Sequence, residues 1–374
     1  MSNILSEGQQ IDFDVSDELK TYLINKFNSQ NKFSISTFTD ELYIKFWETA
    51  VKGFLNGNDV FIGLKKCFPQ LNFPIETEIE KSELYKDIVQ KWKIDSINLE
   101  INLGLTDVKG LNLKLHNSIV GKIPILIVPN KEDFTSIIQS LLYKNNPIPV
   151  PSSMGAVFIN GINNWQRLNS IKKNWLANNP LGNWNNEFSS NVMPNKALYK
   201  DKLIILSTKP YSNVTASQLG LPEDLWISHS ILIRKEHECT HLYTQKRYGI
   251  ASNNLHDELI ADYIGIVKTI GNYNKEWMLI FMGLEEYPKY RKGARLENYV
   301  KEGNLSNEDF KQLIKIIKNA IENIDVFDKT LGKLQSTKDQ MCRIDALCEI
   351  GLVALASQNG ANLLFQRYSL NFQN

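Results

Sequence analysis

The chain has 374 residues, of which 43% are hydrophobic and 22% charged, as in a soluble globular protein with room for one large domain or two ordinary ones. Its 42 basic and 41 acidic residues nearly cancel, so we expect no nucleic-acid partner. No secretory signal opens the chain, and no apolar run approaches the roughly 18 to 20 residues that span a bilayer. The four cysteines are scattered without C-x-x-C spacing. We therefore expect a reduced, cytoplasmic protein without membrane contact.

Helical periodicity dominates the first part of the chain. Ser16-Asp-Glu-Leu and Thr39-Asp-Glu-Leu each precede apolar residues at helical spacing, and a third amphipathic segment runs from about 78 to 93. We predict that residues 1–95 form a helical N-terminal region, a lid or specificity module, in front of a catalytic domain formed by residues 96–374.

From residue 97 apolar and polar residues alternate, which is typical of β-strands. Three such runs predict an antiparallel meander, and two short apolar runs farther along predict further strands. These runs are residues 97–103, 111–115, 119–128, 155–160 and 203–206. A helix is expected between them at residues 130–145.

The Asn- and Trp-rich stretch 163–191 fits a helix followed by a loop held by aromatic anchors. Helices dominate the rest of the chain. They are expected from near residue 228 and at residues 254–270, 274–283, 306–328 and 338–357. The predicted fold class is therefore α+β: an N-terminal helical region, a small mostly antiparallel sheet, and a helical half.

One motif in the first of these later helices points to chemistry. His237, Glu238 and His241 form the pattern H-E-x-x-H. Residues four apart lie above one another on a helix, so both imidazoles can bind one metal ion. Glu238 lies beside that face, within reach of a water molecule on the ion. The alternative interpretation is a pair of surface histidines on an amphipathic helix.

The third ligand is expected in the next helix. In the pattern H-E-x-x-H-x-x-G-x-x-H it would be a histidine, but Thr244 and Arg247 occupy the glycine and histidine positions. Glu258 is the better candidate, because Asp262 follows one turn later and can accept the spare N–H of a ligand histidine. His256 and Asp257 are competing candidates.

In these residues the chain resembles the gluzincins, zinc metallopeptidases whose H-E-x-x-H helix is followed by a helix with the pattern E-x-x-[AS]-D. Glu258-Leu-Ile-Ala-Asp262 matches that second pattern. The resemblance covers only residues 237–262. It implies a zincin-like fold, His237, His241 and Glu258 as ligands of one Zn²⁺ ion, Glu238 as general base, and Asp262 as the partner of a ligand.

The expected function is hydrolysis of a peptide or amide bond in a peptide or protein substrate, with narrow specificity. The metal would activate the attacking water and Glu238 would take its proton. His256, Tyr290 and Arg291 are candidate donors to the oxyanion. Two alternatives stay open: a non-haem Fe(II) oxygenase, with Fe²⁺ on the same two histidines and one carboxylate, and a non-catalytic binding protein stabilised by its metal.

Overall fold

The computed structural model describes residues 15–27, 38–54, 57–93, 102–250, 254–302 and 305–373. The chain divides into two compact units. Unit 1 combines Met1–Thr37 with Pro210–Asn374, and unit 2 is Phe38–Lys209. The boundary expected near residue 95 lies outside the described residues, and the division into units falls elsewhere.

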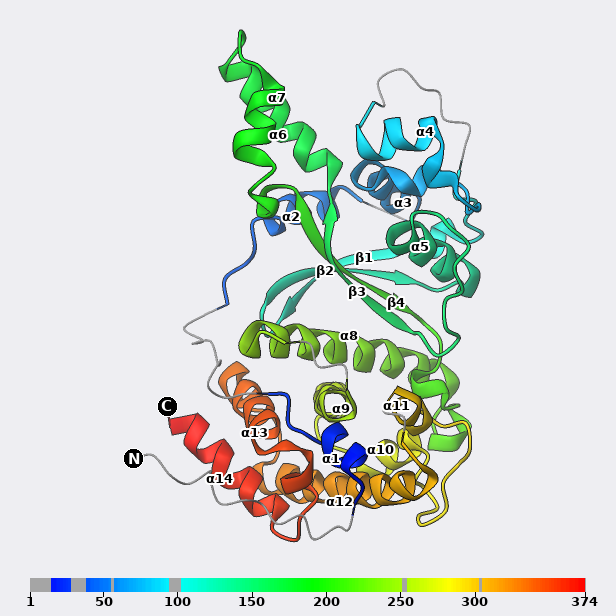
Figure 1. Cartoon of the computed structure of the whole chain (residues 1–374), viewed down its shortest axis with the longest axis vertical. Coiled ribbons are helices and arrows are strands. Elements are labelled where there is room, and N and C mark those ends of the chain that lie inside the picture. Colours follow the sequence, from blue (N-terminus) through cyan, green and yellow to red (C-terminus); the bar gives the residue numbers. More distant parts are fainter. Residues whose placement is uncertain are drawn as a thin grey trace. The chain divides into compact units, whose positions relative to one another are not determined.

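Unit 2 is built on a mixed sheet of four strands (Figure 1). The strands are β1 (Asn112–Ser118), β2 (Gly121–Val128), β3 (Ala156–Asn163) and β4 (Lys200–Ser207), in the order β1-β2-β4-β3. The pairs β1–β2 and β3–β4 are antiparallel, whereas β2 and β4 are parallel. The two inner strands carry the longest buried runs, as expected for strands with a neighbour on each side. Most of the predicted run 97–103 lies outside the described residues.

Three helices pack on the strands and complete the main core of unit 2: α2 (Ile44–Gly53), α3 (Gly57–Cys67) and α5 (Lys131–Tyr143). Trp47 of α2 is fully buried, and its Nε1 donates to Oδ2 of Asp201, 2.8 Å away, at the start of β4. Helices α2 and α3 therefore share the core of the sheet, while α1 (Asp17–Tyr22) belongs to unit 1. The predicted N-terminal region is thus divided between the two units.

The single helix predicted for residues 78–93 is wrong. The chain forms a 3₁₀ turn (Ile79–Lys81), a short α4 (Glu83–Tyr85) and a π turn (Lys86–Gln90). Glu78 has φ 62° and Ser82 is extended, so the backbone leaves the helical conformation twice. The apolar residues recur at helical spacing because they line a small separate cluster with Phe73.

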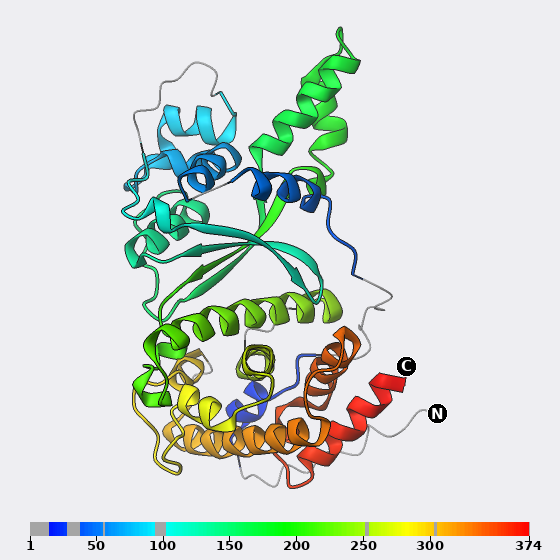
Figure 2. The ribbon, with the colours of Figure 1, turned by 180° about the vertical axis from the view of Figure 1, so that it is seen from behind.

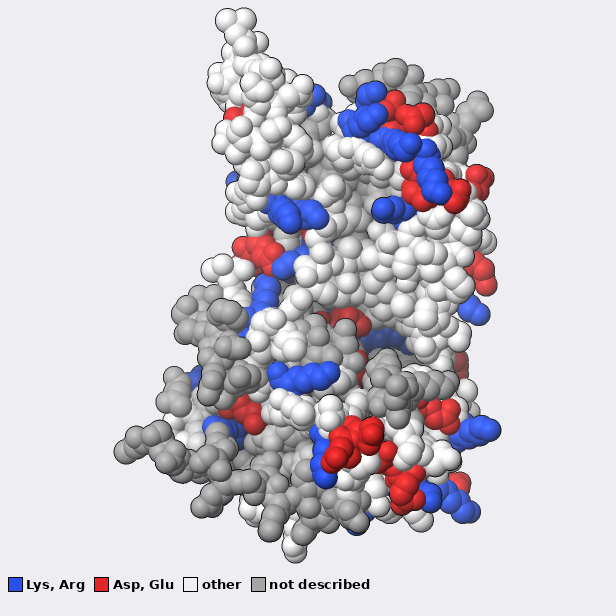
Figure 3. All heavy atoms as spheres, in the orientation of Figure 1, with Lys and Arg blue, Asp and Glu red and all other residues white. Residues whose placement is uncertain are grey.

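The Asn- and Trp-rich stretch forms the helices α6 (Trp165–Asn178) and α7 (Trp184–Glu187), followed by a π turn at Phe188–Val192. Trp165 and Trp184 pack against Leu168, Val192 and Tyr199, so the anchoring role is confirmed for these two tryptophans. The loop expected after the helix is helical in part. Glu187 is the one charged residue between positions 174 and 195. The α6–α7 surface is accordingly almost free of charge in Figure 3.

The described residues of unit 1 form helices joined by loops and contain no strand. Besides α1, unit 1 contains seven helices that are labelled in Figure 1. They are α8 (Glu223–Tyr248), α9 (Leu255–Ile270), α10 (Lys275–Met282), α11 (Leu296–Glu302), α12 (Asn307–Leu331), α13 (Thr337–Leu355) and α14 (Gly360–Gln373). The expected start of α12 is confirmed, because Ser306 and Asp309 form a capping box there. No described helix is both long enough and apolar enough to cross a membrane.

Helices α8 and α9 pack directly on one another. In Figures 1 and 2, α9 is seen end-on while α8 runs across the view, so their axes cross steeply. Gly265 of α9 permits this close approach: a Cβ atom there would lie 2.9 Å from the carbonyl oxygen of Ile233 on α8. The crossing brings one face of each helix together, and the candidate site lies between those faces.

Candidate metal centre

The two motif histidines lie on the 26-residue helix α8. This helix begins at Glu223, five residues before the predicted start, because Pro222 precedes it and Glu223 and Asp224 complement its N-terminal dipole. It ends at Tyr248 and is capped by Gly249, which takes the left-handed conformation with φ 73°. The motif is therefore held well inside a continuous helix, away from both ends.

The next helix supplies the carboxylates. Asn254 caps α9, and its side chain accepts a hydrogen bond from the backbone N–H of Asp257. Glu258 consequently lies in the first turn of α9, and Asp262 lies one turn later on the same face. Because Asn254 is the cap, the carboxylate of Asp257 does not cap the helix and lies beside His241.

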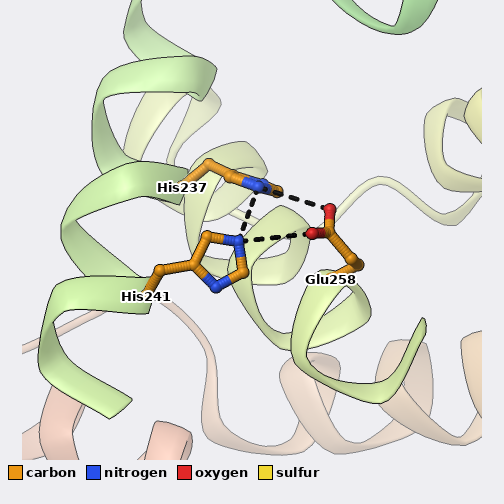
Figure 4. A group of neighbouring side chains, drawn as sticks. All are labelled: His237, His241 and Glu258. Atoms are coloured by element: carbon orange, nitrogen blue, oxygen red, sulfur yellow. Dashed lines mark hydrogen bonds and ion pairs between the residues drawn. The ribbon is translucent and has the colours of Figure 1, made fainter. Parts of the chain in front are cut away.

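The side chains of His237, His241 and Glu258 converge, with the histidines reaching from α8 and the glutamate from α9 (Figure 4). The Nε2 atoms of the two histidines lie 2.9 Å apart. His237 Nε2 is 3.5 Å from Oε2 of Glu258, and His241 Nε2 is 3.5 Å from the other oxygen, Oε1. With ligand bonds of about 2.0–2.1 Å, the donor atoms of a tetrahedral zinc ion lie roughly 3.3 Å from one another. The spacing of the three donor atoms therefore fits one small metal ion.

The far side of each imidazole ring faces a buried carboxylate. His237 Nδ1 lies 2.7 Å from Oδ1 of Asp262, and His241 Nδ1 lies 3.1 Å from Oδ2 of Asp257. A carboxylate on that side favours the tautomer with the proton on Nδ1, which leaves each Nε2 to bind a cation. This arrangement of carboxylate, histidine and shared cation position is typical of metal sites.

Tyr211 completes the surroundings of His237. Its hydroxyl donates to Oδ1 of Asp262 and lies 3.0 Å from Nδ1 of His237. The backbone N–H of Tyr211 donates to the Ser230 hydroxyl on α8, 2.9 Å away. The next residue, Ser212, has φ 54°, a backbone conformation that residues other than glycine rarely adopt. Such backbone conformations are found often at functional sites.

Arg295 joins two of the three carboxylates of α9, those of Glu258 and Asp262. One arm of its guanidinium, Nη1, lies 2.7 Å from Oδ2 of Asp262, and the other, Nη2, donates to Oε2 of Glu258. Its Nε lies 3.0 Å from the hydroxyl of Tyr299. Burial lowers the pKa of Arg295, but Asp262 and its other neighbours outweigh that effect and hold it well above the ordinary value. The guanidinium is therefore a fixed positive charge.

The formal charges of this group favour a divalent cation. With neutral histidines, the three carboxylates of Asp257, Glu258 and Asp262 and the single guanidinium of Arg295 leave a net charge of about −2 in a buried site. Burial lowers the pKa of His241, but the charge of Asp257 outweighs it and holds the pKa well above its usual value. A proton and a metal ion thus compete for the same position.

A family model described as "Family of unknown function (DUF7005)" matches residues 4–359 of the chain. The chain belongs to DUF7005. The match spans both helices of the candidate centre and all three potential ligands, together with Tyr211 and Arg295. Comparison with curated proteins and with solved structures found no match.

Glu238 lies beside the metal-binding face of this DUF7005 chain. It follows His237 directly on α8 and is half-buried. Arg234 lies one turn earlier, where burial lowers its pKa to about 10 and the charges of Tyr211 and Glu238 oppose that shift. Glu238 is therefore a carboxylate next to the site with a buried cation as its neighbour.

The other candidate residues lie outside the group of ligands. His256 is buried on α9, where its Nε2 lies 3.0 Å from the carbonyl oxygen of Leu347 and its ring packs edge-on against Phe27. Tyr290 donates its hydroxyl to the carbonyl oxygen of Ala294, 2.8 Å away. Arg291 pairs with Glu285 and donates to the carbonyl oxygen of Ile280. The structure thus gives each of the three a role in local packing.

Two residues of the DUF7005 site, Tyr211 and Arg295, were not predicted from the sequence, and Asp257 was expected as a competing ligand rather than as the partner of His241. Arg295 lies four residues beyond the predicted Arg291, in a stretch (287–299) that is rich in tyrosine and arginine, and nothing in the sequence ranks these residues. The role of Asp257 becomes clear only once Asn254 is known to cap the helix, so that the carboxylate of Asp257 faces His241. Tyr211 carries no local sequence signal.

Proposed function

We propose that this chain is a zinc-dependent hydrolase that cleaves a peptide or amide bond. The observation that carries the proposal is the set of three donor atoms, two Nε2 atoms 2.9 Å apart and a carboxylate 3.5 Å from each, with a carboxylate behind each imidazole. Two histidines and one carboxylate leave a fourth position of a tetrahedral ion open, which is typical of catalytic rather than structural zinc.

The proposal includes a gluzincin-like arrangement of α8 and α9. Its support is the order of the residues: the H-E-x-x-H helix is followed by a helix that offers Glu258 to the ion and Asp262 to His237. The remaining chain enters this proposal only through Tyr211 and Arg295, which contact Asp262 from outside the motif.

A zinc ion in such a site polarises a carbonyl group and makes water acidic enough to react near neutral pH. Glu238 is the residue that takes the proton of the attacking water and delivers it to the leaving nitrogen. Its place on α8 supports this role, because it is half-buried and adjacent to His237 without being one of the three donor groups. The buried charge of Arg234 keeps a cation near it.

The test combines metal analysis with hydrolysis of a mixed peptide library, followed by mass spectrometry. Glu238→Gln keeps the size of the side chain and removes its basicity, so we expect the variant to bind one zinc ion and to lose at least 100-fold in hydrolysis. The matched control is Glu223→Gln in the exposed first turn of the same helix, which should keep both properties.

Other outcomes point to the two alternatives. Iron bound by the wild-type chain with oxygen consumption would replace the hydrolase by an Fe(II) oxygenase. If the wild-type chain cleaves no peptide and removal of its zinc lowers the melting temperature, the result would indicate a metal-stabilised binding protein. Either result contradicts the proposed function.

A further inference from the structure

Arg295 contacts two carboxylates of the candidate centre, both on α9, and one of them leads on to a histidine of α8. Its Nη2 donates to Oε2 of Glu258, a potential ligand, and its Nη1 lies 2.7 Å from Oδ2 of Asp262. Asp262 in turn holds His237 of α8 through Oδ1, at 2.7 Å. One planar side chain therefore reaches two of the three donor groups, one directly and one through Asp262.

The guanidinium itself is held in place. The side chain of Arg295 is 14% exposed, its Nε lies 3.0 Å from the hydroxyl of Tyr299, and its Nη1 lies 3.4 Å from the hydroxyl of Tyr211. With partners on all three nitrogens, it has little freedom to turn toward a substrate. A flat fork with fixed geometry is suited to join two carboxylates, which a single ammonium group cannot do in the same way.

We infer that Arg295 is a positioning residue of the metal centre, which fixes Glu258 and, through Asp262, His237 in the orientation that binds the ion. This inference rests on the proposed function for the identity of the ion. Because Arg295 occupies Oε2 of Glu258, it leaves Oε1, 3.5 Å from His241 Nε2, as the oxygen offered to the metal. Glu258 then binds through one oxygen, and a further coordination position stays open.

Two effects of Arg295 must be separated. Its positive charge repels a cation, so removal of the side chain would raise the metal affinity for that reason. Its forked guanidinium orients the ligands, so the same removal would also lower the affinity. The variant Arg295→Lys keeps the charge and loses the fork. It isolates the geometric effect.

The experiment measures Co²⁺ binding by the full chain, in competition with a chromophoric chelator, together with the visible absorption spectrum of the bound ion. We expect Arg295→Lys to lower the affinity 10- to 100-fold, the range found when partners of metal ligands are changed, and to alter the spectrum by changing the coordination of the ion. Arg291→Lys is the matched control, since Arg291 lies in the same loop and its described contacts are outside the centre. This variant should leave the affinity for Co²⁺ and the absorption spectrum unchanged.

A second variant covers the case in which Arg295→Lys does not fold, as judged by circular dichroism of the metal-free protein. Tyr299→Phe removes only the hydroxyl at Nε of Arg295 and should lower the affinity for Co²⁺ by a smaller factor, about 2- to 10-fold. Wild-type affinity and an unchanged spectrum in the folded variants would overturn the positioning role. Because no readout depends on catalysis, a chain that binds Co²⁺ but hydrolyses nothing would contradict only the proposed function.

Discussion

Nδ1 of His237 lies 2.7 Å from Oδ1 of Asp262, and the Asp262 side chain is completely buried. A buried carboxylate at this distance fixes the ring and its tautomer, and it raises the electron density at the opposite nitrogen. The pair connects α8 with α9, so the geometry of the ligands depends on the packing of two helices as well as on the spacing within one.

Replacement of Asp262 should therefore weaken metal binding. Asp262→Asn keeps the shape of the side chain but removes the charge that His237 and Arg295 share. We expect the affinity for Zn²⁺, measured by competition with a chelator, to fall 10- to 100-fold. Asp328→Asn is the control: Asp328 is also buried and paired with an arginine, Arg343, so its replacement should lower stability and leave the metal affinity unchanged.

The hydroxyl of Tyr211 makes a smaller contribution of the same kind. Tyr211→Phe removes the donor to Asp262 and leaves the ring in place, so we expect a loss of about 1 kcal/mol in the free energy of unfolding. The affinity for Zn²⁺ should fall by less than in Asp262→Asn. The buried hydroxyl of Tyr273 has no hydrogen-bond partner among the described residues, so Tyr273→Phe should cost nothing in urea denaturation. Equal losses in both variants would contradict this assignment.

His256 should govern acid stability rather than catalysis. Burial lowers its pKa to about 4, against about 6.5 in an unfolded chain. Between these two pKa values His256 is protonated in the unfolded chain and neutral in the folded chain. The free energy of unfolding is therefore at its full value above about pH 6.5 and decreases as the pH falls from about 6.5 toward about 4. The full difference between the two pKa values corresponds to a loss of roughly 3 kcal/mol in the free energy of unfolding.

The variant His256→Gln keeps a donor for the carbonyl oxygen of Leu347 and cannot be protonated in this range. The measurement is urea denaturation at pH 7 and at pH 4.5, with a chelator present to remove any bound metal ion. Between these two pH values the variant should lose less free energy of unfolding than the wild-type chain. The same loss in both would show that His256 does not titrate on unfolding.

Metal binding should stabilise unit 1 selectively. A ligand present at about 1,000 times its dissociation constant raises the free energy of unfolding by roughly 4 kcal/mol. Since the three donor groups lie on α8 and α9, we expect zinc to slow amide hydrogen exchange in these helices and to leave β4 of unit 2 unchanged. Equal protection of both units on zinc addition would argue against a specific site.

The sequence allowed the local part of the centre to be predicted, because helical periodicity alone places residues four apart on one face. His237 and His241, and likewise Glu258 and Asp262, follow from that rule. Arg295 lies 37 residues beyond Glu258, and Tyr211 lies 51 residues before Asp262. Contacts over such separations depend on loop conformation and helix crossing, which no pattern in a single sequence specifies.

The same distinction holds for the fold. The strands β1 to β4 overlap runs predicted from alternation or apolar content, whereas the parallel pairing of β2 with β4 is a tertiary feature. The segment 78–93 shows the opposite error, since its apolar residues recur at helical spacing but Glu78 and Ser82 interrupt the helical backbone. The periodicity of buried positions does not by itself require a continuous helix.

The most direct test of the central claim is the metal content of the purified chain, determined by elemental analysis after dialysis against buffer with trace zinc, iron, manganese and cobalt. The account predicts one tightly bound zinc ion per chain, lost in the double variant His237→Ala/His241→Ala and retained in His256→Gln. A chain that retains no metal, or a double variant with the same zinc content as the wild type, would contradict it.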